Sequence, residues 1–242
     1  MRMKNAFLSA ALAALLLPHL ALWADEAPAH TDMPGVQAID LTRLLAPPPA
    51  EDSQQGKDEL QQVLDLQAKR TDAEAAACVA DQEYSVFRFT DVVGPAFDAA
   101  VLPKTAAYFS AAVDAAKATV DASKGHWDRR RPFLVDSRVQ PCDKPSKSAS
   151  YPSGHATAGT VMAILLADLV PEKQAAIYAR GWLFAQHRVM GGVHFPSDIA
   201  AGRIAGTVVA QAILADPGMQ AMARQARAEL RSALKLDGNQ AP

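Results

Sequence analysis

The stretch that decides the fold is residues 151–170, YPSGHATAGTVMAILLADLV, a short polar opening followed by an apolar run. Val161, Leu165 and Leu169 recur in it at helical spacing, so the run after His155 is predicted to be a buried helix. The polar residues before the run then stand at the N-terminus of that helix. Backbone N–H groups there have no partner within the helix and are available to a ligand.

The composition of the whole chain favours the same fold class. Of 242 residues, 50% are hydrophobic but only 6% are aromatic, and alanine is frequent, which favours helices over strands. A single core can grow to roughly 250 residues before chains usually divide. Lys and Arg number 24 against 26 Asp and Glu, which argues against a disordered chain and against a nucleic-acid partner. We therefore predict an all-α, single-domain helical bundle.

Capping and breaking residues predict where several helices begin and end. Pro is favoured at a helix start, Gly at its end, and Ser, Thr or Asp at the N-cap. The predicted boundaries are a capping box at residues 71–74, a buried helical stripe over residues 105–123, a helix from Pro171 to Gly191-Gly192, a cap at Ser197, and a last helix from Asp216-Pro217 to a stop at Gly238.

The first residues predict export. Residues 1–24 carry Arg2 and Lys4, then an apolar run, and precede Asp25, which is the layout of a cleaved signal peptide; an uncleaved anchor is the alternative. Residues 25–50 are predicted to form a Pro-containing arm and residues 51–242 the helical domain. No later segment offers about 20 uninterrupted apolar residues, so we expect a periplasmic or secreted protein without stable membrane insertion.

The chain has two cysteines, Cys78 and Cys142. In an oxidising compartment they could form a disulfide, which would close a long loop and stabilise the fold by about 4 kcal/mol in the chain-entropy model. Two separate buried thiols are the alternative.

Three segments carry the residues suited to chemistry. The first is a basic run in which Lys124 and Arg131 lie seven positions apart, so that both could point to one side if the segment were helical. The second is Ser153-Gly154 at the start of a helix, which suits an anion, although Ser153 could also be an ordinary cap. A charge run is more often a solvated face.

The third segment contains Arg188, His194 and Asp198. A carboxylate that holds one ring N–H of a histidine leaves the other nitrogen as a free lone pair, as a nucleophile requires, although a surface pair has the same spacing. Taken together, three cations and a helix N-terminus are too costly to bury without a multiply charged guest such as phosphate. His155 and His194 would supply an acid and a nucleophile.

These motifs resemble those of a known family. Lys124-x6-Arg131-Pro132, Pro152-Ser153-Gly154-His155 and Arg188-x5-His194-x3-Asp198 are similar to the three-part signature of the type 2 phosphatidic acid phosphatase and vanadium haloperoxidase superfamily. Within it, the bacterial class A non-specific acid phosphatases are the most similar, and further likeness at residues 45–50, 150–151 and 179–181 extends the resemblance over most of the chain after the signal.

The resemblance implies a metal-independent acid phosphatase without a cofactor that hydrolyses small phosphomonoesters through a phosphohistidine. It implies that phosphate and vanadate inhibit, that phosphate can pass to an alcohol acceptor, and that the protein could form a homo-oligomer. By position, His194 would be the nucleophile, Asp198 its orienting group and His155 the acid. Lys124, Arg131, Ser153, Gly154 and Arg188 would hold the phosphate oxygens, and a protonated His155 beside an anion would give an acidic optimum.

One position departs from the family pattern, and three other functions stay open. The family commonly has Ser where this chain has His187, which puts the packing around Arg188 in doubt. The alternatives are a vanadate-dependent haloperoxidase, a non-catalytic periplasmic phosphate-binding protein and a lipid-phosphate phosphatase. A binding protein has no use for an Asp198–His194 pair opposed by a second histidine.

Overall fold

The computed structural model describes residues 32–142, 144 and 146–236, and every regular element in these residues is helical. This confirms the predicted all-α fold class. The elements are α1 (Pro34–Gln37), α2 (Leu41–Leu44), α3 (Gln54–Lys69), α4 (Asp72–Ala80), η1 (Val86–Phe89), α5 (Thr90–Val93), α6 (Pro103–Trp127), α7 (Pro132–Val135), α8 (Gly154–Leu169), η2 (Pro171–Lys173), α9 (Gln174–Met190), α10 (Pro196–Ala215) and α11 (Pro217–Ala233).

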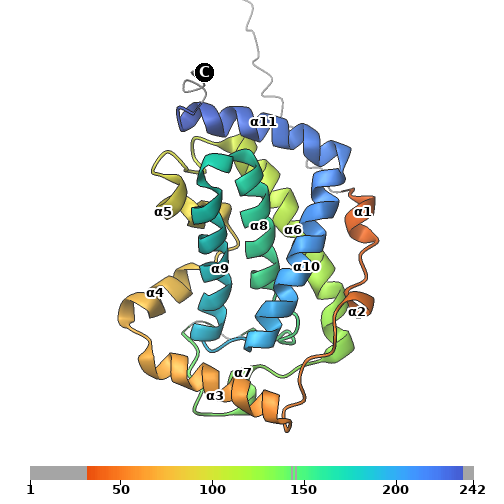
Figure 1. Cartoon of the computed structure of the whole chain (residues 1–242), viewed down its shortest axis with the longest axis vertical. Helices are drawn as coiled ribbons and strands as arrows, with labels where there is room; N and C mark the ends of the chain where they lie inside the picture. The colour runs from red at the N-terminus through yellow and green to blue at the C-terminus, as the bar shows by residue number, and fades with distance from the viewer. Residues whose placement is uncertain (1–31, 143, 145, 237–242) are drawn as a thin grey trace, which may run out of the picture.

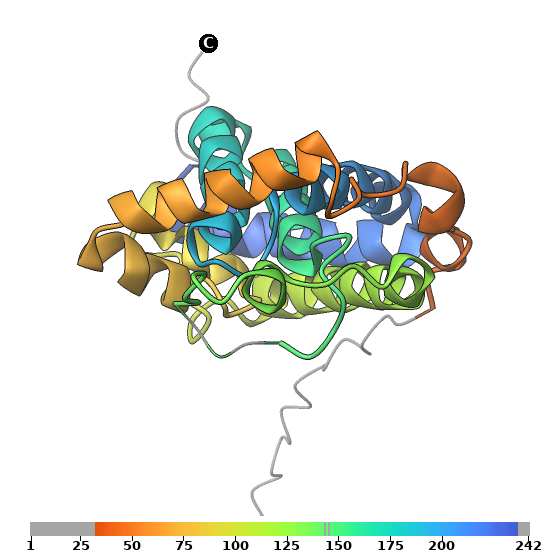
Figure 2. The ribbon, with the colours of Figure 1, turned by 90° about the horizontal axis from the view of Figure 1, so that it is seen from below.

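Helix α8 is the centre of the bundle. It packs against α10, α9 and α6, and Figure 1 shows α8, α9 and α10 side by side, with α11 across one end and α3 across the other. Seen from below in Figure 2, α3 runs across the near end of these helices and α6 lies along one side of them. Because it is enclosed, α8 is apolar nearly all round, and Val161, Leu165 and Leu169 are fully buried as predicted.

Two glycines let α10 approach α8 closely. A Cβ at Gly202 would lie 2.6 Å from the carbonyl oxygen of Ser153, and one at Gly206 would lie 2.6 Å from that of Thr157. Side chains there would force the helices apart. The close approach also allows the backbone N–H of Ser153 to donate to the carbonyl of Asp198 at 3.1 Å, so the starts of the two helices are locked together.

Four long helices begin or end at one end of the bundle. Helix α6 ends where Asp128 adopts a left-handed conformation with φ 43°, and α9 ends at Gly191. Helices α8 and α10 begin there, after Ser153 and Phe195. The segments that connect these termini carry the candidate residues, so the fold brings three distant parts of the sequence to one place.

Most of the predicted boundaries are confirmed, and two are wrong. The capping box at Thr71 and the helix end at Gly191 are present. Helix α10 begins at Pro196, and the Asp198 carboxylate caps the Phe195 N–H, so Ser197 is not the cap. Helix α11 ends at Ala233, before the predicted stop at Gly238. Lys124 and Arg131 do not share a helix, because α6 ends at Trp127, but both line the same cavity.

The N-terminal predictions are only partly within the described residues. The proposed signal peptide, residues 1–24, lies outside them. Of the predicted arm, residues 32–50 are described; they form α1 and α2, which pack against α10 and α6. Among the described helices, α10 is long and apolar enough to cross a bilayer, but half of its most apolar window is buried in the bundle, as in the core helix of a soluble protein.

Candidate active site

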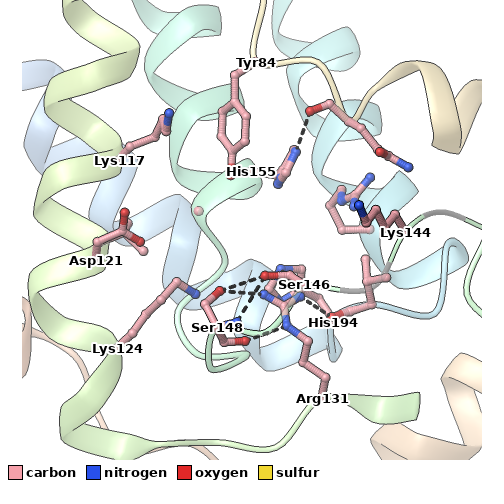
Figure 3. A pocket seen from close by; sticks show the side chains of 15 residues that line it. Tyr84, Lys117, Asp121, Lys124, Arg131, Lys144, Ser146, Ser148, His155 and His194 are labelled. Atoms are coloured by element: carbon pink, nitrogen blue, oxygen red, sulfur yellow. Dashed lines mark hydrogen bonds between the residues drawn. The ribbon is translucent and has the colours of Figure 1, made fainter. Parts of the chain in front are cut away.

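A cavity of about 230 Å³ opens at the end of the bundle where the four helix termini meet. Its lining includes Lys124, Arg131, Gly154, His155, Arg188 and His194, and Figure 3 shows the side chains that face it. All six were predicted from the sequence to belong to a phosphate site. Of the other predicted residues, Asp198 lies behind His194, and Ser153 is fully buried and is not part of the lining.

Lys124 and Arg131 are held in place by backbone carbonyls. The Lys124 ammonium donates to the carbonyls of Ala149 at 2.7 Å and Pro152 at 3.0 Å. Arg131 donates to the carbonyls of Ser148 and Val193, each at 2.8 Å. Burial and the neighbouring Arg131 charge lower the pKa of Lys124 to about 8, so the lysine is still largely charged at neutral pH.

The start of α8 supplies the backbone of the site. The Ser153 hydroxyl accepts the N–H of Ala156 at 3.3 Å, which is the ordinary capping role that the sequence left open for it. Gly154 borders the cavity, and a Cβ there would lie 3.1 Å from the Tyr84 hydroxyl. The first turn of α8 therefore faces the cavity with its backbone N–H groups and the positive end of its dipole.

His155 is fixed by a backbone carbonyl and an aromatic ring. Its Nε2 lies 3.1 Å from the carbonyl oxygen of Gln82, and its ring centroid lies 3.9 Å from that of Tyr84. Because a carbonyl only accepts, Nε2 carries the proton in the neutral ring and Nδ1 has the lone pair. Burial and the Arg188 charge hold the pKa of His155 well below its usual value. The ring is therefore neutral in the empty cavity, whereas the sequence analysis expected it to be protonated.

His194 has the geometry of a nucleophile. Its Nδ1 lies 3.3 Å from the Asp198 carboxylate, so that Nδ1 donates and Nε2 keeps its lone pair. Nε2 lies 3.3 Å from a guanidinium nitrogen of Arg131, on the cavity side. Burial is the main cause that lowers the pKa of His194 to about 3. The Arg131 charge lowers this pKa further, whereas the bond to Asp198 raises it. His194 thus stays unprotonated in acidic solution. Its Nε2 lone pair accepts from Arg131 in the empty cavity, so that donor must turn to a phosphate oxygen before Nε2 can attack.

The carboxylate of Asp198 accepts three hydrogen bonds besides the one from His194. It accepts from Ser150 Oγ at 2.5 Å, from the Phe195 N–H at 2.8 Å and from Arg129 at 2.6 Å. Burial opposes its ionisation, but the bond to His194 and the Arg129 charge lower the pKa of Asp198 to about 2. Asp198 is therefore ionised wherever His194 is neutral, which fixes the His194 tautomer.

Behind Asp198 lies an ion pair that the sequence analysis missed. Arg129, only 7% exposed, donates to Glu59 of α3 at 2.8 Å as well as to Asp198. Sequence reasoning saw Arg129 as part of a basic run and gave it no role. Its only signal is that Trp127 and Pro132 border the run, since apolar neighbours favour burial of part of it. Glu59 had no signal, since it lies 70 positions away.

A second buried network accounts for His187. Its Nδ1 lies 2.7 Å from the carboxylate of Asp81, which also accepts from Arg180 at 2.7 Å and from Arg88 at 3.1 Å. These bonds hold the pKa of Asp81 below its usual value although burial opposes this. His187 is not among the residues that line the cavity. It helps to anchor Asp81, and the next residue along the chain is Gln82, whose carbonyl orients His155.

Arg188 connects the site to the two cysteines. Its guanidinium borders the cavity and donates to the carbonyl of Cys78 at 3.2 Å. Cys78 and Cys142 do not form a disulfide in the structure, but their thiols are hydrogen-bonded. Burial is the main cause that raises the pKa of Cys78 to about 12, and the neighbouring Cys142 is the second. The Cys142 N–H donates to the carbonyl of Gly191 at 3.1 Å. The pair joins α4 to the loop that carries Ser148 and Ala149.

The thiol contact makes the predicted disulfide testable. Protein recovered from an oxidising compartment should have a mass lower by two hydrogens than its reduced form. Reduction should lower the free energy of unfolding by about 4 kcal/mol, because the bond closes a loop between residues 64 positions apart. Two alkylatable thiols in unreduced protein would contradict the prediction. Cys78→Ala/Cys142→Ala is the control, and its stability should not respond to reductant.

No group of three or more His, Cys, Asp or Glu side chains with the arrangement of a metal site occurs among the described residues. The cavity instead gathers ammonium and guanidinium donors, a helix N-terminus and two histidines. Such a set is suited to hold a tetrahedral oxyanion and to stabilise charge that spreads over its oxygens.

Known proteins match the part of the chain that builds this cavity. The family model for the PAP2 superfamily matches residues 105–221. The non-specific acid phosphatase of Salmonella typhimurium is 38% identical over 117 residues, which are 47% of this chain and 46% of that protein. The acid phosphatase of Zymomonas mobilis is 34% identical over 145 residues, 58% of this chain and 54% of its own. The matches span about half the length of these relatives.

One further relative and one solved structure are also similar to this chain. The non-specific acid phosphatase of Providencia stuartii is 33% identical over 120 residues, 48% of each chain. Among solved structures, a bacterial vanadium-dependent iodoperoxidase superposes with a TM-score of 0.47 and 20% identity, over 69% of this chain and 52% of that chain.

Proposed function

Because residues 105–221 match the family model for the PAP2 superfamily, we propose that this protein is an acid phosphatase that hydrolyses phosphate monoesters through a phosphohistidine at His194. The observation that carries the proposal is the state of His194 in the cavity. Its Nε2 lone pair faces the cationic cavity while Asp198 holds the opposite nitrogen. The relatives named acid phosphatase support this reaction over the haloperoxidase alternative.

In the proposed first step, Nε2 of His194 attacks phosphorus and the bond from phosphorus to the alcohol oxygen breaks. His155, across the cavity, is neutral before substrate binds, so its Nδ1 takes the proton that the substrate monoanion brings and passes it to the departing oxygen. Lys124, Arg131, Arg188 and the Gly154 N–H bind the outer phosphate oxygens and stabilise the charge that spreads over them. In the second step water attacks phosphorus and the bond from phosphorus to Nε2 of His194 breaks. His155 takes the water proton and passes it to the departing phosphate. An alcohol in place of water gives the transferase side reaction.

A phosphate-binding protein is the second candidate, and the geometry of the histidines argues against it. Binding needs the cations and the helix N-terminus only. The buried chain from Arg129 through Asp198 to His194 orients one imidazole and fixes its tautomer, which contributes nothing to binding an anion. A nucleophile requires this arrangement.

The proposal is tested by hydrolysis of 4-nitrophenyl phosphate at acidic pH in the presence of EDTA, with labelled substrate quenched in alkali. We expect turnover that survives EDTA, and a phosphoenzyme that is stable in base and labile in acid. Phosphate and vanadate should inhibit. Turnover without any trapped phosphoenzyme would indicate direct attack by water, and absence of turnover would leave the phosphate-binding function.

The pH dependence of kcat/KM should show an optimum between about pH 3 and pH 6. The acidic limb comes from His194, whose pKa of about 3 marks loss of the nucleophilic lone pair. The alkaline limb has a different origin. Since His155 is neutral in the empty cavity, its proton must arrive with the substrate monoanion, which deprotonates near pH 6. Deprotonation of Lys124, whose pKa is about 8, should lower the rate further.

Measurement of kcat/KM for 4-nitrophenyl phosphate from pH 2.5 to 8.5 at constant ionic strength checks this prediction. An acidic limb near pH 6.5 would contradict it, because it would show that His194 titrates as an ordinary exposed imidazole.

We also propose that the protein is exported to the periplasm or secreted, on the basis of the charge and apolar pattern of residues 1–24. The homo-oligomer stays a prediction from family resemblance, and gel filtration of the purified protein tests it.

A further inference from the structure

The cavity contains more positive charge than one phosphate needs. The described residues that line it include five cations, namely Lys117, Lys124, Arg131, Lys144 and Arg188, and a single carboxylate, Asp121. A bound phosphate dianion offsets only part of this charge. Because a cleft focuses the potential of its lining charges, a substrate with a second anion would be attracted more strongly than one without.

The position of Lys117 identifies where that second anion would lie. Figure 3 shows the Tyr84 ring between Lys117 and His155, across the cavity from Arg131 and His194. If His194 attacks and His155 protonates the departing oxygen, the alcohol part of the substrate lies on the His155 side. The Tyr84 ring, which lies against His155, and the Lys117 ammonium beside it therefore border the leaving group.

The Lys117 ammonium is available to bind an anion. It lies 5.3 Å from the centroid of the Tyr84 ring, and within the described part of the chain no carboxylate is within ion-pair distance of it. Asp121, one turn further along α6, lies between Lys117 and Lys124 in sequence and offsets part of their charge. Lys117 is half-buried, so an ion pair there is screened less than one on the open surface.

We propose that Tyr84 and Lys117 form a leaving-group subsite that favours phosphomonoesters whose alcohol part carries a second anionic group, a carboxylate or another phosphate. The inference rests on the proposed phosphatase function and names the substrate class of the same site. Tyr84 supplies a ring face for the carbon skeleton next to the scissile bond, and Lys117 supplies the charge beyond it.

The test compares two substrates that differ in charge but hardly in size, 4-carboxyphenyl phosphate and its neutral carboxamide, at pH 5.5. We expect wild-type kcat/KM to be about fivefold higher for the carboxylate, and the preference to shrink as salt is added. Lys117→Gln should reduce the preference to about one. Lys117→Arg should keep it, and so should Lys104→Gln, a change of the same charge at an exposed position near the other end of α6.

The outcomes separate the inference from the proposed function. Equal kcat/KM for the two substrates in wild type, or a preference that persists in Lys117→Gln, overturns the leaving-group subsite while the phosphatase stands. No hydrolysis of either substrate overturns the proposed function, and the inference with it. The comparison within wild type does not depend on whether a variant folds.

Discussion

Replacing His194 by alanine is expected to lower kcat for 4-nitrophenyl phosphate by at least about 10⁴-fold, because it removes the imidazole nitrogen that forms the proposed covalent intermediate. His155 is not a substitute, since its lone pair belongs to the leaving-group side and its Nε2 is bonded to the Gln82 carbonyl. The trapped phosphoenzyme should disappear together with the activity.

The cations remain in the alanine variant, so it should still bind inorganic phosphate, which distinguishes loss of the nucleophile from loss of the fold. His126→Ala is the matched control, because His126 is exposed at the end of α6 and outside the cavity lining. Its kcat should stay within about twofold of wild type. Activity of the His194 variant within tenfold of wild type would show that the nucleophile is a different group.

Replacing Arg129 by methionine is expected to lower the free energy of unfolding by about 3–5 kcal/mol. The change removes the cation that lies between Glu59 and Asp198, both of which are buried, and leaves two carboxylates without their common partner. Removing one member of a buried ion network is costly because the remaining charges stay out of water. Activity should fall as well, since Asp198 would become easier to protonate and would orient His194 less firmly.

Arg130→Met, the next residue along the chain, is the control for this prediction. The Arg130 side chain is 55% exposed and pairs with Glu51 at the surface, so its loss should change the stability by at most about 0.5 kcal/mol. Urea denaturation of both variants measures the difference. Similar stabilities of the two variants would mean that the buried Arg129 network is not needed. Glu59→Gln added to the Arg129 variant should restore part of the lost stability.

The helices and the main site residues could be predicted because their signals are local. The capping box at Thr71 and the glycine pair after α9 determine helix ends within a few residues. His194 and Asp198 are four positions apart at the start of one helix, so their contact requires no knowledge of the rest of the fold. The three motifs and their family resemblance then indicated which side chains meet.

The supporting residues could not be predicted, because their partners are distant in the sequence. Nothing local distinguishes Arg129, which is buried against Glu59 and Asp198, from Arg130, which is exposed. Tyr84 carries no motif, and it reaches His155 only because η1 and α8 pack in the same core. Ser150 was noted as part of the resemblance, but its bond to Asp198 depends on how the loop before α8 folds.

The sequence by itself determined the helical class, most helix ends and the list of groups suited to hold a phosphate, because helix periodicity, capping and side-chain chemistry are properties of neighbouring residues. Only the tertiary structure decided that Ser153 is a buried cap outside the cavity lining, that His155 is neutral, and that Asp198 is held by Arg129. Burial and the charge of distant neighbours set these properties, and both arise only when separate helices pack together.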